Sequence, residues 1–476
     1  MSRARLFIEN FVVYGLGSML SKFVPLVMLP IVTRLMPDAG YYGYSDLSNT
    51  LVSLMQPVAI MGMYDAMFRM FFERDDEDFK RRVCSTALFF VTGMAVVVAL
   101  CMVLLRDPIA RLFFGGAEFV NLALVSAATV LVAGNNTIIQ APTRMQNKRL
   151  VFVVMNLSIA LLSYAVSLPL LLAGEYLMAL PIAAFIVAVF SLVVFAVLNR
   201  RWFGFRRFDL GLLKTMLAIG IPLMPGFLFY WAFNSASRVV IVSALGVGAA
   251  GVFAIAAKVG QVSQLIYTAF AQGWQYFAFS TMKDDDQVEL NSRIYEYLGA
   301  ASFLATALVI AVMDPVYRTL FTAEYAGGIV CVPYLFLAPL LMMLYQVAVN
   351  QLLVVKRTWP SLVMLASGAA VCVVLQLALV PVLGIEGAGV GTLCGYLVTN
   401  AVALAWLTRM KLMAVPRRFC ALGLVFGAFF AVWRFALMGD TFALCIAFCA
   451  FAAVCAYLYR GELRGAVRKI KKKKEA

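Results

Sequence analysis

The sequence predicts an all-α protein that crosses a membrane about fourteen times, as two six-helix lobes followed by two further helices. Three observations lead to this fold class. Hydrophobic residues make up 63% of the 476-residue chain and charged residues only 13%, well below the ~25% of a typical soluble protein. Apolar runs of membrane-spanning length recur along the chain. The second half also repeats features of the first at a constant spacing.

The apolar runs define the predicted spans, because a helix needs about 20 residues to cross the hydrocarbon core. Short polar connectors separate them, and no long soluble domain interrupts them. The spans are expected at residues 11–33, 44–71, 83–105, 119–140, 150–173, 177–198, 214–236, 245–275, 294–313, 326–352, 359–382, 386–407, 419–438 and 441–459.

The basic residues predict the topology. If the N-terminus is cytoplasmic, most of the 39 lysine and arginine residues fall in cytoplasmic segments. The outer segments then hold only Arg34, Arg106, Arg111, Arg238 and Arg318. This positive-inside bias predicts that both termini are cytoplasmic. The net charge of +15 is therefore a topology signal, and no nucleic-acid partner is expected.

The two ends of the chain carry weaker signals. The basic tail VRKIKKKKEA would suit anionic lipid headgroups, or it is simply the last cytoplasmic anchor. The opening segment MSRARLFIEN has no small-residue cleavage site beside a short apolar core, so no removable signal peptide is expected.

An internal repeat with an offset of about 208 residues organises the spans. Gly43 matches Gly251 and Gln56 matches Gln264 at this offset. With six helices per copy, both copies have the same orientation, so the lobes are related by a pseudo-twofold axis along the membrane normal. The crevice between lobes is the expected binding site. The predicted parts are an N-terminal lobe at 1–205, a C-terminal lobe at 206–410, two additional helices at 411–459 and a basic cytoplasmic tail at 460–476.

Polar residues inside the spans mark candidate cavity walls, since a charge at mid-bilayer costs at least ~2.5 kcal/mol unless it faces water or a partner. In the second span, Asp46, Asn49, Ser53 and Gln56 share one helical face. Polar positions in the first, seventh and eighth spans complete the set. These are Ser18 and Lys22, then Asn234 and Arg238, then Lys258, Gln261 and Gln264.

The net charge of these polar positions indicates a class of ligand. Lys22, Arg34, Arg238 and Lys258 outnumber Asp46, so the cavity is expected to be cationic. A cationic, amide-rich cavity suits a phosphate-bearing substrate with a polar sugar portion. The alternative is that these groups pair to hold the lobes together, for example Asp46 with Arg34 or Lys258.

Two further features bear on movement. Asp65 and Arg69 lie toward the cytoplasmic end of the second span and either form a local pair or act as an inner gate. Proline pairs occupy equivalent places in the first span of each lobe, where kinks would either bend during alternating access or stay fixed by packing. These prolines are Pro25 and Pro30, and Pro222 and Pro225.

The sequence carries no sign of an enzyme. It has no phosphate-binding Walker loop, no histidine for a zinc site and no nucleophilic serine elbow. The nine cysteines show no framework spacing and are expected to be small buried hydrophobes. We therefore expect a membrane transporter without cofactor, driven by an ion gradient, the membrane potential or the substrate gradient.

Two runs carry a resemblance to a known family: PIVTRLMPDAGYYGYSDL at 30–47 and MGMYDAMFRMFFE at 61–73. They resemble the N-terminal signature of bacterial polysaccharide flippases of the multidrug, oligosaccharidyl-lipid and polysaccharide exporter superfamily. The matching positions are Pro30, Thr33, Arg34, Gly43, Gly62 and Arg69. The chain length, the helix count and the repeat offset agree with the same family.

The resemblance implies a flippase of the bacterial inner membrane that moves undecaprenyl-pyrophosphate-linked oligosaccharide to the outer leaflet for surface polysaccharide synthesis. Lys22 and Lys258 would then meet the pyrophosphate, with Arg34 and Arg238 nearer the outer mouth. Membrane lipids and a polysaccharide polymerase or glycosyltransferases are the implied partners. Proton or sodium coupling would use Asp46 or Asp65. Related lipid II flippases carry an arginine-dense first helix, whereas this chain has only Lys22 there, which favours the polysaccharide branch.

Two other functions stay open. A multidrug–cation antiporter of the same fold would depend on an essential cavity carboxylate. A non-transporting scaffold of a glycan-assembly complex would tolerate neutralisation of the cavity charges.

Overall fold

The protein is described by a computed structural model that covers residues 23–146, 148–204, 207–280, 286–355 and 359–462. In these ranges eleven helices are long and apolar enough to cross a membrane, and up to 13 if each of two bent pairs counts as one span. The predicted all-α membrane fold is confirmed. The predicted span at 11–33 lies partly outside the described residues, which include only its helix Phe23–Leu35. The count of fourteen spans stays a prediction.

The chain divides into two compact units. Unit 1 contains Met1–Lys258 and Ala369–Gly395, and unit 2 contains Val259–Gly368 and Tyr396–Ala476. The two helices α15 (Trp359–Leu383) and α16 (Ile385–Arg409) contribute residues to both. This division groups contacts in space, whereas the predicted lobe boundaries rest on the sequence repeat and stay a prediction.

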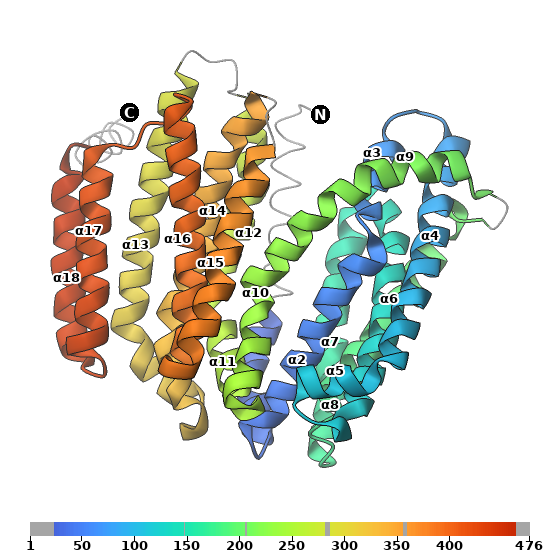
Figure 1. The fold of residues 1–476 in the computed structure, drawn as a ribbon, viewed down its shortest axis with the longest axis horizontal. Coiled ribbons are helices and arrows are strands. Elements are labelled where there is room, and N and C mark those ends of the chain that lie inside the picture. Colours follow the sequence, from blue (N-terminus) through green and yellow to red (C-terminus); the bar gives the residue numbers. More distant parts are fainter. Residues whose placement is uncertain (1–22, 147, 205–206, 281–285, 356–358, 463–476) are drawn as a thin grey trace, which may run out of the picture. The chain divides into compact units, whose positions relative to one another are not determined.

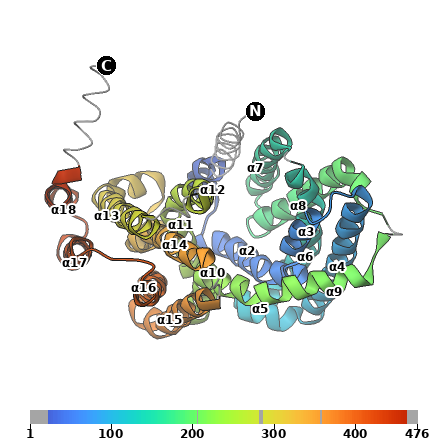
Figure 2. The same cartoon turned by 90° about the horizontal axis from the view of Figure 1, so that it is seen from above.

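Unit 1 is built around α6 (Val120–Met145), which packs against α2 (Ala39–Ile60), α4 (Glu77–Leu104) and α8 (Ala179–Asn199) (Figures 1 and 2). Its remaining helices are α3 (Met63–Phe71), α5 (Arg106–Phe114), η1 (Ala117–Phe119), α7 (Arg149–Leu172), η2 (Arg200–Trp202), α9 (Leu210–Gly220), η4 (Ile221–Leu223), α10 (Met224–Leu245) and most of α11 (Val247–Gly260).

Several helices start or end outside the predicted apolar runs. The helix α4 begins at Glu77 because Asp76 accepts hydrogen bonds from the free amides of Asp78 and Phe79, at 3.1 and 3.2 Å. The helix of the seventh span passes through the 3₁₀ turn Ile221–Leu223, which contains Pro222. Proline lacks the amide that a continuous α-helix needs, which accounts for this local 3₁₀ geometry, and the kink predicted at the prolines stays a prediction.

The second span is broken. Met61 and Gly62 have φ angles of 48° and 67°, in the left-handed region, and the axes of α2 and α3 differ by 48°. At Gly62 a Cβ atom would lie 2.7 Å from the Cα of Gly220 in α9, so both the backbone angle and the space require glycine. The eighth span is also broken, with 47° between Val247–Gly260 and the following helix.

Unit 2 has α14 (Val332–Val354) at its centre, packed against α12 (Ser263–Ser280) and α13 (Gln287–Leu320). The helix α13 extends well beyond its predicted span of 294–313 and also packs against α17 (Arg417–Val432) and α18 (Thr441–Leu458) (Figure 1). The short segments η5 (Ala323–Cys331) and η6 (Trp433–Leu437, a π-helical turn) complete the unit. The two additional C-terminal helices are thus anchored by one long helix.

Candidate functional site

The polar face of α2 is divided among different neighbours. Asp46 is buried, Asn49 is exposed, and the Ser53 hydroxyl donates to the carbonyl of Thr50 at 2.8 Å. The Gln56 amide donates to the Ala133 carbonyl at 3.3 Å and the Thr137 hydroxyl at 3.1 Å, both in α6. Of the four predicted wall residues, Asn49 alone has an exposed side chain. Gln56 instead holds α2 against α6.

Asp46 forms a buried ion pair with Arg238 of α10. The Nε of Arg238 lies 2.6 Å from Oδ2 of Asp46, and the two side chains are only 8% and 7% exposed. Sequence analysis considered Arg34 or Lys258 as the partner of Asp46, and both were wrong. The reason is the packing of α10 against α2, which brings together residues 192 positions apart.

Further contacts surround the Arg238 guanidinium and join α10 to α2. Arg238 donates to the carbonyl of Asn234, and its guanidinium lies 5.9 Å from the centre of the Phe253 ring in α11. The indole of Trp231 donates to the carbonyl of Thr50 at 3.2 Å. The guanidinium is therefore satisfied by a carboxylate, a carbonyl and an aromatic face, as a buried charge requires.

Helices α2 and α11 meet at two glycines that the repeat relates to each other. A Cβ atom on Gly43 would lie 2.6 Å from the Val247 carbonyl oxygen and 3.0 Å from the amide nitrogen of Gly251. A Cβ atom on Gly251 would overlap the carbonyl of Ala39. These glycines are 208 residues apart, as are the first residues of the two helices, Ala39 and Val247. Backbones can approach this closely only without side chains.

The other predicted cations differ from Arg238 in their exposure to solvent. Lys258 and Arg34 are both exposed, and Lys258 forms no ion pair within the described residues. By helical spacing Lys258 lies two turns after Gly251, on the side of α11 that meets α2. Lys22 lies outside the described residues. Lys258 is thus an accessible charge, in contrast to Arg238.

The predicted amides are partly engaged. Asn234 is half-buried and donates to the carbonyl of Tyr230 at 2.8 Å. Gln261 and Gln264 are half-buried at the break between α11 and α12, where the backbone N–H of Gln264 donates to the backbone carbonyl of Gln261 at 2.9 Å. These two glutamines belong to unit 2.

Asp65 and Arg69 do not pair. Both are exposed on the short helix α3, and no ion pair joins them in the described part of the chain. The local pair favoured by their four-residue spacing is therefore wrong, because exposed side chains gain little from such contacts. Their roles as ion-coupling or gate residues stay predictions.

A buried polar cluster in unit 2 was missed by sequence analysis. Glu296 of α13 accepts two hydrogen bonds from Arg418 of α17, at 2.5 and 3.0 Å, and one from the hydroxyl of Tyr459, at 3.0 Å. The Glu296 side chain is 2% exposed. Glu296 lies near the start of the predicted span at 294–313, and sequence analysis gave it no role. The cluster ties α17 and α18 to α13.

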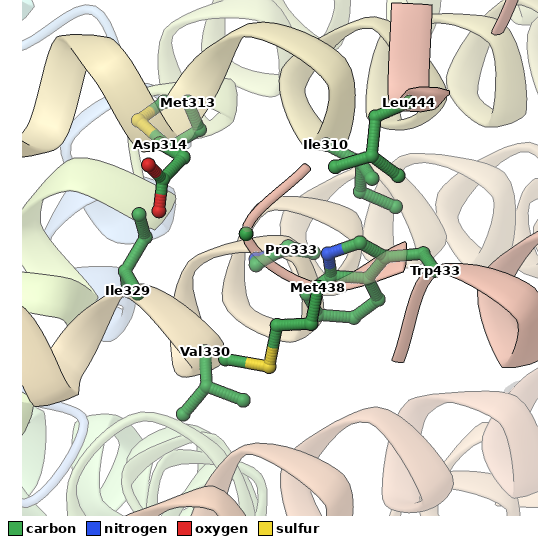
Figure 3. A pocket seen from close by; sticks show the side chains of 10 residues that line it. Ile310, Met313, Asp314, Ile329, Val330, Pro333, Trp433, Met438 and Leu444 are labelled. Atoms are coloured by element: carbon green, nitrogen blue, oxygen red, sulfur yellow. The ribbon is translucent and has the colours of Figure 1, made fainter. Parts of the chain in front are cut away.

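A cavity in unit 2 contains none of the predicted residues. It lies between α13, η5, α14, η6 and α18, and it is lined by Ile310, Met313, Asp314, Ile329, Val330, Pro333, Trp433, Met438, Gly439 and Leu444 (Figure 3). The carboxylate of Asp314 accepts from Nε of Arg318 at 2.8 Å. The lining is otherwise apolar.

Comparison with known proteins adds to this geometry. Residues 31–330 match the profile of a family described as polysaccharide biosynthesis protein. No match was found among curated protein sequences.

Solved membrane transporters share the fold. The lipid II flippase MurJ in an inward closed conformation superimposes with a TM-score of 0.72 at 13% identity, over 96% of this chain and 99% of that chain. An inward-facing multidrug resistance MATE family transporter of the MOP superfamily gives a TM-score of 0.60 at 15% identity, over 83% and 98%. A mutant of the Vibrio cholerae MATE transporter VcmN gives a TM-score of 0.56 at 15% identity, over 86% of this chain and 97% of that chain.

Proposed function

Because the chain belongs to the polysaccharide biosynthesis protein family, we propose that it is a flippase for lipid-linked oligosaccharide. It moves undecaprenyl-pyrophosphate-linked repeat units from the cytoplasmic to the outer leaflet by alternating access, for surface polysaccharide synthesis. The family match over residues 31–330 is the observation that carries this proposal. The fold shared with transporters supports the mode of action.

The charges of the site support an anionic cargo. Asp46 is neutralised by Arg238, so the exposed Lys258, which forms no ion pair within the described residues, adds a positive charge to unit 1. Lys258 and Arg34 meet the pyrophosphate in our proposal, together with Lys22. Asn49 and Asn234 of unit 1 are the proposed contacts to sugar, whereas the Gln56 amide is already bonded to α6. Among these, the exposed Asn49 is the strongest candidate.

The membrane potential can supply a driving force. Outward movement of about two negative charges gains ~2.3 kcal/mol per charge per 100 mV of inside-negative potential. In this proposal the protein lies in the bacterial inner membrane with both termini in the cytoplasm. A polymerase or glycosyltransferases would consume or supply its cargo. Coupling to a proton or sodium gradient would add to the free energy that the membrane potential supplies.

An antiporter for lipophilic cations is the second candidate, and the MATE transporters with the same fold favour it. Such an exporter would need a carboxylate free to exchange a proton for the drug. In the described part of the spans, two of the three buried carboxylates, Asp46 and Glu296, are paired with arginine, and the third, Glu386, is engaged as well. This pairing favours the flippase.

The test of the proposal is mass spectrometry of lipid extracts from a deletion strain beside wild type. We expect undecaprenyl-pyrophosphate oligosaccharide to accumulate and the matching surface glycan to be lost. The mass of the accumulated lipid would identify the cargo. An unchanged lipid pool together with new sensitivity to cationic drugs would refute the flippase and support the antiporter.

Lys258 provides a residue-level test. We expect Lys258→Ala to abolish glycan export while the protein still inserts, because an accessible cation that pairs with the cargo contributes more than an ordinary surface charge. Lys258→Arg, which keeps the charge, is the control and should retain export. Normal surface glycan in a well-expressed Lys258→Ala strain would disprove the role of this lysine, and a scaffold would also predict that result.

A further inference from the structure

The short helix α3 has one buried and one exposed side. Met63, Met67 and Met70 are buried in the core of unit 1. The opposite side begins with Tyr64 and continues with Phe68, which is 37% exposed, and Phe72, which is 60% exposed. Because α3 follows the break at Gly62, its orientation differs from that of α2 by 48°. Large aromatic rings are thus held at the surface by a backbone break.

These aromatic rings form a continuous row. The ring centres of Tyr64 and Phe68 are 6.2 Å apart, and those of Phe68 and Phe72 are 5.5 Å apart. Aromatic faces carry a negative quadrupole, which attracts C–H groups as well as cations. The C–H face of a sugar ring is such a partner.

An arginine from another helix stands beside this row. Nη1 of Arg144, at the end of α6, donates to the hydroxyl of Tyr64 at 3.0 Å, and its guanidinium lies 5.4 Å from the centre of the Phe152 ring. Arg69 projects from α3 itself and is exposed. We call the set Tyr64, Asp65, Phe68, Arg69, Phe72 and Arg144 the α3 platform.

Among the residues that the structure describes, the two arginines of the α3 platform have no carboxylate partner, in contrast to other cations of the same region of unit 1. Lys80 pairs with Asp75 at 2.5 Å, and Arg81 pairs with Glu77 at 2.6 Å. Arg207 pairs with Asp78 at 3.2 Å. Within the residues described by the structure, neither arginine of the α3 platform forms an ion pair. Two forked donors are therefore available to an outside anion, and phosphate oxygens match their geometry.

The carboxylate of Asp65 distinguishes between two anionic ligands. It is exposed on α3, one turn before Arg69. Its charge would oppose either phosphate group, so the difference between the two ligands lies in the hydroxyl groups that they carry. The carboxylate accepts hydrogen bonds from hydroxyl groups, which a saccharide offers in number. Aromatic rings, two arginines and a carboxylate together suit a sugar pyrophosphate better than a phospholipid.

From this geometry we propose that the α3 platform is a docking site for the saccharide-pyrophosphate headgroup of a lipid-linked oligosaccharide before it crosses the membrane. The arginines bind the pyrophosphate, the row of aromatic rings packs against the first sugar, and Asp65 accepts from its hydroxyl groups. The inference rests on the proposed function. It adds an entry site on the continuation of the helix that carries Asp46 and Asn49.

Photo-crosslinking in the full-length protein tests this site. Phe72 is replaced by p-benzoyl-phenylalanine, and the purified variant is reconstituted with lipid extract from the deletion strain, in which the proposed substrate accumulates. After irradiation, the lipid joined to the protein is identified by mass spectrometry. We expect an adduct that contains a polyprenyl pyrophosphate saccharide. In an Arg69→Gln, Arg144→Gln background its yield should fall at least about tenfold, as expected for the loss of two charge-assisted hydrogen bonds.

Two controls make each outcome decisive. The same crosslinker at Leu104, which is 80% exposed on α4, should capture phospholipid and shows that the protein is inserted. Arg81→Gln removes a cation that is already paired and should leave the Phe72 adduct unchanged. Only phospholipid at Phe72, or no adduct there, would overturn the inference. A deletion strain that accumulates no lipid-linked oligosaccharide would instead refute the proposed function.

Discussion

Removing either member of the Asp46–Arg238 pair should destabilise the protein strongly, and removing both should destabilise it less. The two groups are 2.6 Å apart and at most 8% exposed, so neither can recover its hydration if the other is lost. Two unit charges about 4 Å apart interact by ~4 kcal/mol at an effective dielectric constant of ~20. Breaking a buried pair typically costs about 3–5 kcal/mol.

The comparison of variants isolates the interaction. Asp46→Leu and Arg238→Met should each lower the free energy of unfolding by about 3–5 kcal/mol. The double variant leaves no uncompensated charge and should lose less than either single variant, because apolar replacement of a buried pair is often neutral. The coupling free energy from this cycle should therefore exceed about 2 kcal/mol.

The assay is reversible unfolding in mixed micelles by titration with sodium dodecyl sulfate, followed by circular dichroism. The exposed pair Glu289–Arg293 is the matched control. Its atoms are 2.5 Å apart, but its side chains are 65% and 61% exposed. Solvent screening should keep the coupling of that pair at about 0.3–0.5 kcal/mol. Additive losses at Asp46 and Arg238, with a coupling below about 0.5 kcal/mol, would refute the reasoning.

Two other changes have clear expected results. Gly251→Ala should reduce the yield of folded protein and cost about 2 kcal/mol or more, because its Cβ atom would overlap the Ala39 carbonyl. Gly248→Ala, where no atom lies within 4 Å, should be close to neutral, and equal effects in the same unfolding titration would contradict this view. Glu296→Gln should cost about 1.5–3 kcal/mol, because the buried carboxylate loses its charge-assisted hydrogen bonds while Arg418, which is 34% exposed, keeps Glu462 as a partner. Glu289→Gln, at an exposed site, should cost less than about 0.5 kcal/mol, and similar melting temperatures for the two would argue against a structural role of the buried cluster.

The membrane-spanning helices could be predicted from the sequence because hydropathy is a local property. A segment that must lie in hydrocarbon needs apolar side chains along its whole length, whatever its neighbours are. The predicted spans at 83–105 and 359–382 accordingly correspond to Glu77–Leu104 and Trp359–Leu383. The extra turns at the start of α4 could not be read from hydropathy, because they lie in the polar region and depend on a cap at Asp76.

The contacts of the candidate site could be predicted only in part. The spacing of Asp46, Asn49 and Gln56 correctly places them on one side of a helix. It does not show that Asp46 turns to α10, that Gln56 bonds to α6 or that Asn49 stays exposed. These differences depend on how each neighbouring helix is rotated and how closely it approaches.

The sequence by itself determined that this protein lies in a lipid bilayer, where its helical spans run, which polar residues lie within them and to which family it belongs. Each of these is recorded in composition, in local pattern or in motifs at short spacing. The tertiary structure alone decided which charges are neutralised and which are available. Arg238 and Lys258 look alike in the sequence, yet one is buried against Asp46 and the other is exposed. The reason is that the energy of a charge in a membrane protein depends on the partner and the water within a few ångströms, and residues far apart in the chain supply both.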